Sequence, residues 1–288
     1  MKHAHMTSLV ADFLRADALI RTEKSPVARH RVWAREFERP HSDAFRLYYQ
    51  WANRRAAARV FANYTTYYSR ERIQRLERYA RMHLDTIAAK VHRVIPFSGK
   101  LPVVLFVGLK QSNGFVIKYK EQYTTFLNLE SYPDTITLQI FMAHELAHNA
   151  HLRMGQGYYW KSKKMDWYNT MMLEGVATYA TQKALRLNSA DALWGTYFST
   201  VQKKRFTRWC ERHERWLKDR LLREIDGTAM TESAFFGARK PRGCPYIRTG
   251  YWLGLKFVES LLREMSLREV LLLRGGALRW QIRIFLRK

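Results

Sequence analysis

The spacing of apolar and polar positions predicts a helical first third, a short strand-rich middle and a helical second half. Residues 68–93 give the clearest helical pattern, because apolar side chains recur there every three or four positions, with Arg and Glu on the opposite face. These apolar positions are Ile73, Leu76, Leu84, Ile87 and Val91. Before them, residues 1–66 are predicted to form basic helical segments that break near Pro26 and Pro40.

Three short segments after residue 100 have the composition of β-strands. They are LPVVLFVGL (101–109), FVIKYK (115–120) and TTFLNLE (124–130), and the QSNG between the first two is typical of a turn. Pro133 and Asp134 then open a helix whose body is ITLQIFMAHELAHNAHL. The middle of the chain is therefore predicted to be a small sheet followed by one largely apolar helix.

The second half of the chain is predicted to be helical throughout. One helix covers residues 166–185, a long one runs from Ser189 or Asp191 to about Ile225, and another contains YIRTGYWLGLKFVESLLREM. The expected fold is α+β and mostly helical. We expect an N-terminal helical region (1–93), a sheet with the motif helix (94–156) and a helical C-terminal part (157–288).

The chain is strongly basic, with 50 Lys and Arg against 25 Asp and Glu and a formal net charge of +25. Such a field attracts polyanions, which include nucleic acid, anionic lipid and acidic protein. The basic residues are spread along the chain among acidic ones, so the sequence predicts a basic surface rather than a basic tail. With 47% hydrophobic residues and only seven prolines, the chain is expected to be ordered and globular.

Cysteine usage and the absence of long apolar runs bear on the compartment. Cys210 and Cys244 are the only cysteines and lack CxxC spacing, so we expect two buried free thiols, with a single disulfide as the alternative. The first 24 residues lack a continuous apolar core and a small-residue cleavage site, and no run of about 18 apolar residues exists. The sequence thus predicts no secretory signal, no membrane span and a cytoplasmic location.

The stretch FMAHELAHNAHL (141–152) carries the candidate chemistry. His144 and His148 are four residues apart, which on a helix puts both imidazoles on one face and suits two ligands of a single tetrahedral metal. Glu145 lies about 100° around the helix from His144. It can therefore miss the metal and still reach a water beside it, as a general base must. The HExxH motif is typical of zinc-dependent hydrolysis of peptide bonds.

A third protein ligand is needed, with the fourth position left open for water. His151 shares the stripe but lies about 10 Å along the helix axis from His144, too far to bind the same metal, so we expect it to orient a ligand or to be structural. Glu174 is the better candidate, because a carboxylate among apolar neighbours is unexpected without a partner. These neighbours are Met171, Met172, Leu173, Val176 and Ala177. The alternative for Glu174 is an exposed position on an amphipathic helix.

HELAH followed by LEGVATY resembles the gluzincin class of zinc metallopeptidases, and most of all a group of predicted zinc-dependent proteases with an EGxA-type second motif. RTGYWLGLKFVESLL (248–262) is similar to a glycine-tyrosine helix of that group, so the resemblance covers roughly residues 95–265. It implies a zincin-like core, with His144, His148 and Glu174 as Zn²⁺ ligands and Glu145 as the base. It also implies that TTFLNLE is the edge strand that pairs with an extended peptide substrate.

In such enzymes a tyrosine or histidine often stabilises the oxyanion, and Tyr251 is the candidate here, with Tyr246 and Tyr179 as rivals. A buried tyrosine that only packs by its ring is the alternative. In the implied mechanism the zinc lowers the pKa of a water, and Glu145 takes its proton and passes it to the leaving amine. The positive charge of the chain favours acidic peptides or proteins as substrates.

Two other functions compete with a peptidase. QKKRFTRWCERHERWLKDRLLRE (202–224) has nine Lys and Arg with Phe206, Trp209 and Trp216 between them, and aromatic and cationic side chains together bind nucleic acid. The simpler interpretation is an amphipathic helix with its aromatic side chains in the core and its basic side chains in solvent. A zincin scaffold without catalysis is the third possibility, although Glu145 is present.

Overall fold

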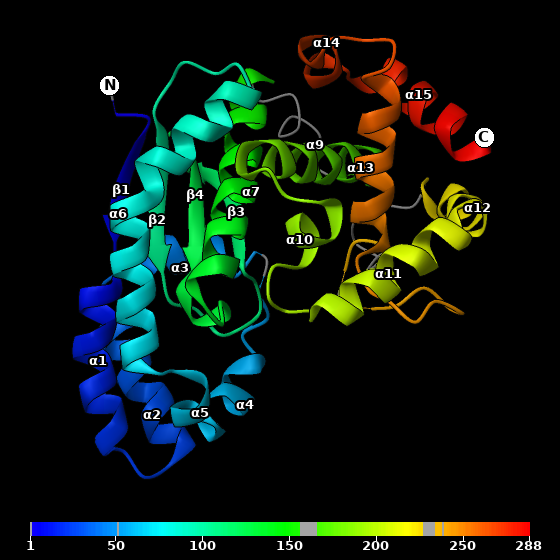
Figure 1. Ribbon diagram of the computed structural model, residues 1–288. Coiled ribbons are helices and arrows are strands. Elements are labelled where there is room, and N and C mark those ends of the chain that lie inside the picture. Colours follow the sequence, from blue (N-terminus) through cyan, green and yellow to red (C-terminus); the bar gives the residue numbers. More distant parts are fainter. Residues whose placement is uncertain (1, 51, 156–165, 227–233, 238) are drawn as a thin grey trace. The chain divides into compact units, whose positions relative to one another are not determined.

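The computed structural model describes residues 2–50, 52–155, 166–226, 234–237 and 239–288 (Figure 1). They form an α+β protein of mostly helices with one small mixed sheet, which confirms the predicted fold class. Two compact units are present, Met1–Ala88 with Gly99–Glu145, and Ala89–Ser98 with Leu146–Lys288. Within the described ranges, no helix is both long and apolar enough to span a membrane.

The first unit contains a four-stranded sheet in the order β1-β2-β4-β3. β1 (Ala4–Ser8) and β4 (Gln122–Asn128) pair in parallel with β2 (Leu101–Phe106), whereas β3 (Gly114–Tyr119) pairs with β4 in antiparallel. The three strands expected after residue 100 are thus confirmed. β1 was missed, because the sequence analysis predicted only helices in the first 66 residues.

The expectation that TTFLNLE forms the edge of the sheet is wrong. This segment is β4, which has β2 on one side and β3 on the other, so β3 forms that edge of the sheet and β1 the opposite one. A two-residue turn of Lys120 and Glu121, with φ of 47° and 65°, folds β3 back onto β4. Such left-handed turns usually contain Asn or Gly, so the sequence gives little sign of this hairpin.

Helices cover both faces of the sheet in the first unit. Six short helical segments precede residue 68, and they are α1 (Val10–Thr22), α2 (Pro26–Trp33), η1 (Ala34–Glu38), α3 (Ser42–Tyr48), α4 (Ala56–Ala62) and α5 (Tyr64–Tyr67). Two of them, η1 and α3, cover one face, where Phe106 of β2 contacts the rings of Phe37 and Phe45. α6 (Arg70–Val94), which confirms the predicted amphipathic helix, lies on the other face, where Ser8 of β1 donates a hydrogen bond to Glu77.

α7 (Thr135–Met154) is the helix of the HExxH motif, and it follows η2 (Leu129–Ser131). Asp134 starts it as predicted, because its carboxylate accepts a hydrogen bond from the backbone N–H of Thr137 at 2.7 Å. Apolar side chains cover most of its circumference and are buried, as in a helix that lies within a protein core. They include Leu138, Phe141, Met142, Leu146 and Ala150.

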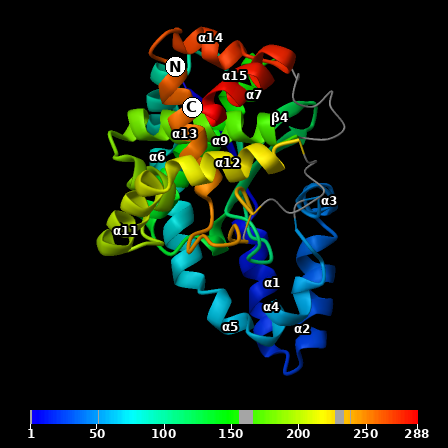
Figure 2. The same cartoon turned by 90° about the vertical axis from the view of Figure 1, so that its right-hand side faces the viewer.

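The second unit is helical, as predicted, with α9 (Trp167–Leu185) and α13 (Thr249–Leu261) at its centre (Figures 1 and 2). α14 (Leu267–Leu272) and α15 (Gly275–Arg287) follow them. Gly175 and Gly254 lie at the crossing of α9 and α13, where a Cβ on Gly175 would stand 2.3 Å from the carbonyl oxygen of Gly254. The two helices can approach this closely only because both positions lack a side chain.

The long helix expected between about residue 189 and Ile225 is wrong. The segment forms α10 (Ser189–Trp194), α11 (Thr200–Arg212) and α12 (Glu214–Glu224). Gly195, with φ of 50°, ends α10, and Ser199 starts α11 with a capping box. Cys210 and Cys244 are buried and free, which confirms the expectation for the thiols. The expected division of the chain into residues 1–93, 94–156 and 157–288 stays a prediction. Its second boundary lies at residues outside the described ranges.

Glu130 in η2 is an ionisable group that is fully buried in the first unit. Its Oε1 accepts a hydrogen bond from the backbone N–H of Lys110, whereas its buried Oε2 has no hydrogen-bond partner among the described residues. Burial raises its pKa from 4.5 to about 7, although backbone N–H groups and Lys110 act in the opposite direction. The folded protein therefore favours the protonated carboxyl group.

We predict that Glu130 lowers the free energy of unfolding as the pH rises from about 4.5 to above 7. A raised pKa in the folded state contributes stability that is complete below about pH 4.5 and is lost as the pH rises to about 7. The loss should approach about 3 kcal/mol in the parent chain. Denaturant unfolding at pH 4.5 and pH 8 measures it, and Glu130→Gln should reduce the difference between the two pH values. An equal pH dependence in both chains would contradict the assignment.

Candidate metal centre

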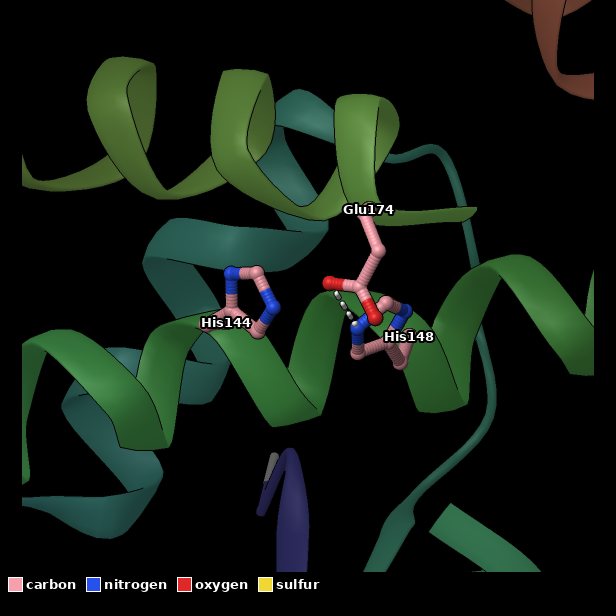
Figure 3. Close-up of side chains that lie close together, drawn as sticks. All are labelled: His144, His148 and Glu174. Carbon is pink, nitrogen blue, oxygen red and sulfur yellow. Dashed lines mark ion pairs between the residues drawn. The ribbon is translucent and has the colours of Figure 1, made fainter. Parts of the chain in front are cut away.

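Two histidines of α7 and one glutamate of α9 bring their ligand atoms together. One such atom from each of His144, His148 and Glu174 lies within 4.8 Å of the other two. Figure 3 shows Glu174 pointing from α9 toward the two imidazoles, which leave α7 one turn apart. The structure thus assembles the three residues that the sequence analysis selects as ligands, while their binding of zinc stays a prediction.

The donor geometry fits a zinc ion. His148 Nε2 and Glu174 Oε2 are 3.4 Å apart, and two donors on a tetrahedral zinc with bonds of about 2.1 Å stand about 3.4 Å apart. Two imidazoles and one carboxylate are also a common ligand set of catalytic zinc, which keeps its fourth position for water. The side chains of His148 and Glu174 are 12% and 17% exposed, so water can reach this position.

Contacts at the start and near the middle of α9 hold Glu174 in place. Asp166 caps the helix by accepting a hydrogen bond from the backbone N–H of Asn169 at 2.8 Å, and Arg279 of α15 pairs with the same carboxylate at 2.7 Å. The crossing with α13 then fixes Gly175, the next residue after Glu174. Since most neighbours of Glu174 on α9 are buried and apolar, the helix has little freedom to rotate this carboxylate away.

Glu145 lies beside the edge strand and is only 7% exposed. A Cβ on Gly114 in β3 would stand 2.8 Å from Glu145 Cγ and 3.0 Å from its Cδ. The carbonyl of Glu145 also accepts a hydrogen bond from the Thr125 hydroxyl of β4 at 3.5 Å. Glu145 is therefore packed against the sheet and is not part of the cluster of possible metal ligands. The sequence pattern assigns Gly114 to the QSNG turn, so its place in β3, where a glycine allows close approach, is not predicted.

A comparison with protein families identifies the relationship. The model of a family described as "Predicted Zn-dependent protease (DUF2268)" matches residues 109–274, which is more than half of the chain. The chain belongs to this family. The matched range includes Gly114, Glu145 and all three candidate ligands. Neither a curated protein nor a solved structure matches the chain.

His151 has a structural position in this member of the predicted zinc-dependent protease family. It is fully buried, and its Nε2 lies 3.1 Å from the carbonyl oxygen of Leu271 in α14. Burial lowers its pKa to about 3, so the imidazole is neutral near pH 7 and its Nε2–H can donate to this carbonyl. His151 thereby links α7 to a segment 120 residues further along the chain, and it does not belong to the ligand cluster.

The three candidate tyrosines occupy different surroundings. Tyr246 contacts the rings of Phe206 and Trp209, whereas the Tyr251 ring packs near Phe236 and Arg248. Tyr251 is one turn before Gly254 on α13, and Tyr179 is one turn after Gly175 on α9. Tyr251 and Tyr179 are thus each one turn from the crossing beside Glu174, whereas Tyr246 lies on the loop before α13. Tyr251 as the oxyanion donor stays a prediction.

We predict that the parent chain binds about one zinc per molecule and that His148→Ala and Glu174→Ala weaken zinc binding more than about a hundredfold. The reason is that each change removes one of three protein ligands, a larger loss than that of an outer-shell partner. Zinc retained after dialysis, measured by mass spectrometry, and competition with a chelator test this. His83→Ala, at an exposed histidine of α6, is the control and should leave binding unchanged. Equal zinc retention in all variants would refute the ligand set.

Proposed function

We propose that this chain is a zinc metallopeptidase of gluzincin type with a zincin-like core. The observation that supports this most is the cluster of His144, His148 and Glu174, with Glu145 next to it, in a chain of a predicted Zn-dependent protease family. The proposed zincin-like core consists of the small mixed sheet, α7 on one of its faces, and α9, which supplies the glutamate ligand.

The chemistry follows from the positions of the side chains. A zinc held by the three ligands would supply Lewis acidity and a water of lowered pKa. We assign to Glu145 the role of accepting a proton from that water and delivering it to the leaving amine. Its packing against β3 keeps the carboxylate beside the ligands without joining them. We propose Tyr251 as the donor to the oxyanion.

We propose that the substrate binds along the edge strand β3. Among the described strands, β3 pairs with β4 alone, so one row of its backbone N–H and C=O groups is available to an extended peptide. Gly114 lies on this strand next to Glu145, which brings a peptide paired to β3 close to the proposed base. We further propose that acidic peptides are preferred, since the chain carries a net charge of +25.

We expect Glu145→Gln to keep zinc and to lower kcat by about 10²–10⁴-fold. The amide cannot accept the proton, while the three ligands are untouched. A digest of acidic and basic peptide libraries, followed by mass spectrometry, measures cleavage, and the zinc content is measured on the same samples. Equal cleavage by variant and parent would rule out Glu145 as the base. A zinc-loaded parent that cleaves no peptide would instead favour a scaffold without catalysis.

Gly114→Ala should lower kcat on the order of a hundredfold while zinc affinity stays unchanged. The added methyl group would overlap Glu145 Cγ and Cδ as well as the carbonyl oxygen of Phe126 in β4. The resulting displacement of the carboxylate lowers kcat, since a shift of about 1 Å can cost this much. The matched control is Gly276→Ala on α15, where an added Cβ meets nothing within 4 Å. A parent-like kcat in Gly114→Ala would show that the close approach has no part in catalysis.

A further inference from the structure

The outward face of α11 in the second unit carries a stripe of unpaired cations. Lys204, Arg205, Arg208 and Arg212 are all exposed, and their spacing of three and four residues places them on one side of the helix. Among the described residues, none of the four forms an ion pair, whereas their neighbour Lys203 pairs with Asp191. We call these four residues the α11 stripe.

The α11 stripe does not stabilise its own helix. Cations four residues apart, as in the pairs Lys204–Arg208 and Arg208–Arg212, repel each other. Glu211 is the one acidic residue in α11, and it forms no ion pair with the stripe. By contrast, α12 pairs Lys218 with Glu214 and Arg215 with Asp219. Within the described part of the chain, no ion pair offsets the repulsion along α11, which an external anion would relieve.

Half-buried aromatic side chains lie next to the stripe. Trp209 follows Arg208 directly, stacks on His213 at 4.4 Å, and contacts Trp216 at 6.0 Å and Tyr246 at 5.8 Å between ring centroids. Phe206 and Cys210, in contrast, are buried on the inner side of α11. The predicted amphipathic pattern is therefore present, but it is divided between α11 and α12, and of its three aromatic side chains only Phe206 is fully buried.

A loop before α13 adds further cations to this surface. Gly243 lies against Trp216, since a Cβ there would stand 3.4 Å from the indole, and Tyr246 contacts Trp209. Residues 239–248, the described part of the chain directly before α13, thus lie beside α11 and α12 (Figure 1). Lys240 and Arg242 on this loop are exposed and form no ion pair within the described part of the chain.

We propose that the α11 stripe, together with Trp209, Trp216 and Tyr246, binds single-stranded nucleic acid. Unpaired cations neutralise phosphates, and partly exposed aromatic rings next to them offer surfaces for unstacked bases. An anionic membrane fits less well, because Val201 is the one large apolar side chain exposed on α11. An acidic protein would be bound by the cations alone, which leaves Trp209, Trp216 and Tyr246 without a role. This proposal does not depend on peptidase activity.

The test is a titration of a labelled 20-nucleotide single strand with the full chain, followed by fluorescence anisotropy at several salt concentrations. The variant Lys204→Gln, Arg205→Gln, Arg208→Gln, Arg212→Gln should bind about a hundredfold more weakly at 0.1 M salt. Its slope of log affinity against log salt should be smaller by about three, since each phosphate contact contributes about 0.7. Glu145→Gln should bind as the parent does, which separates this result from the failure of the peptidase proposal.

A matched control removes four cations elsewhere. Arg55→Gln, Arg59→Gln, Arg75→Gln, Arg78→Gln changes the net charge equally at exposed residues of the first unit that form no ion pair among the described residues. Its affinity should stay within a few-fold of the parent. If both fourfold variants lose affinity equally, binding depends on net charge alone and the α11 site is refuted.

A second measurement tests the aromatic group and the choice of ligand. Crosslinking of an oligonucleotide with thio-substituted bases should label peptides that contain Trp209, Trp216 or Tyr246, and labels confined to other peptides would overturn the proposal. Polyglutamate of equal charge and vesicles with phosphatidylserine serve as competitors. Displacement of the strand by either at the same charge concentration would assign the surface to acidic proteins or to membranes instead.

Discussion

The close approach of α9 and α13 is the constraint on which the candidate metal centre depends. At their crossing, Gly175 and Gly254 meet backbone to backbone, at a distance that even one methyl group would prevent. Glu174 is the residue before Gly175, so the crossing determines where its carboxylate stands. The start of α9 is also held, because Asp166 caps the helix and pairs with Arg279. The position of Glu174 is therefore set at two points along α9.

α7 differs from α9 and α13 in that it carries several polar side chains into an apolar core. His144, Glu145, Asn149 and His151 are all buried in this helix, and each buried polar group without a partner has a high free-energy cost. His151 meets this cost with the carbonyl of Leu271, and His148 with the carboxylate of Glu174. For these two histidines of α7, the partners thus come from α9 and α14, which lie further along the chain.

The sequence could predict those features that depend on local spacing. A spacing of four residues from His144 to His148 suffices to place them on one face, and a glutamate within an apolar helix indicates a buried partner. The sequence could not reveal β1, because this short strand pairs with β2 almost a hundred residues later, nor the hairpin turn, because Lys120 and Glu121 are not typical turn residues. The breaks after α10 and α11 replace one long apolar pattern by three helices, and Gly195 was their clearest signal.

Glycines determine the position of both carboxylates that the proposed chemistry needs. Gly114 leaves the space on β3 into which Glu145 fits, and Gly175 with Gly254 lets α9 take the position that presents Glu174. In neither case is φ the reason, since none of these three glycines has a positive φ, so it is the missing side chain that matters. The missing side chains at these three positions thus leave room for Glu145 beside β3 and for the close approach of α9 to α13 next to Glu174. This explains why HExxH alone, which gives only the order of the residues, is not sufficient to specify the site.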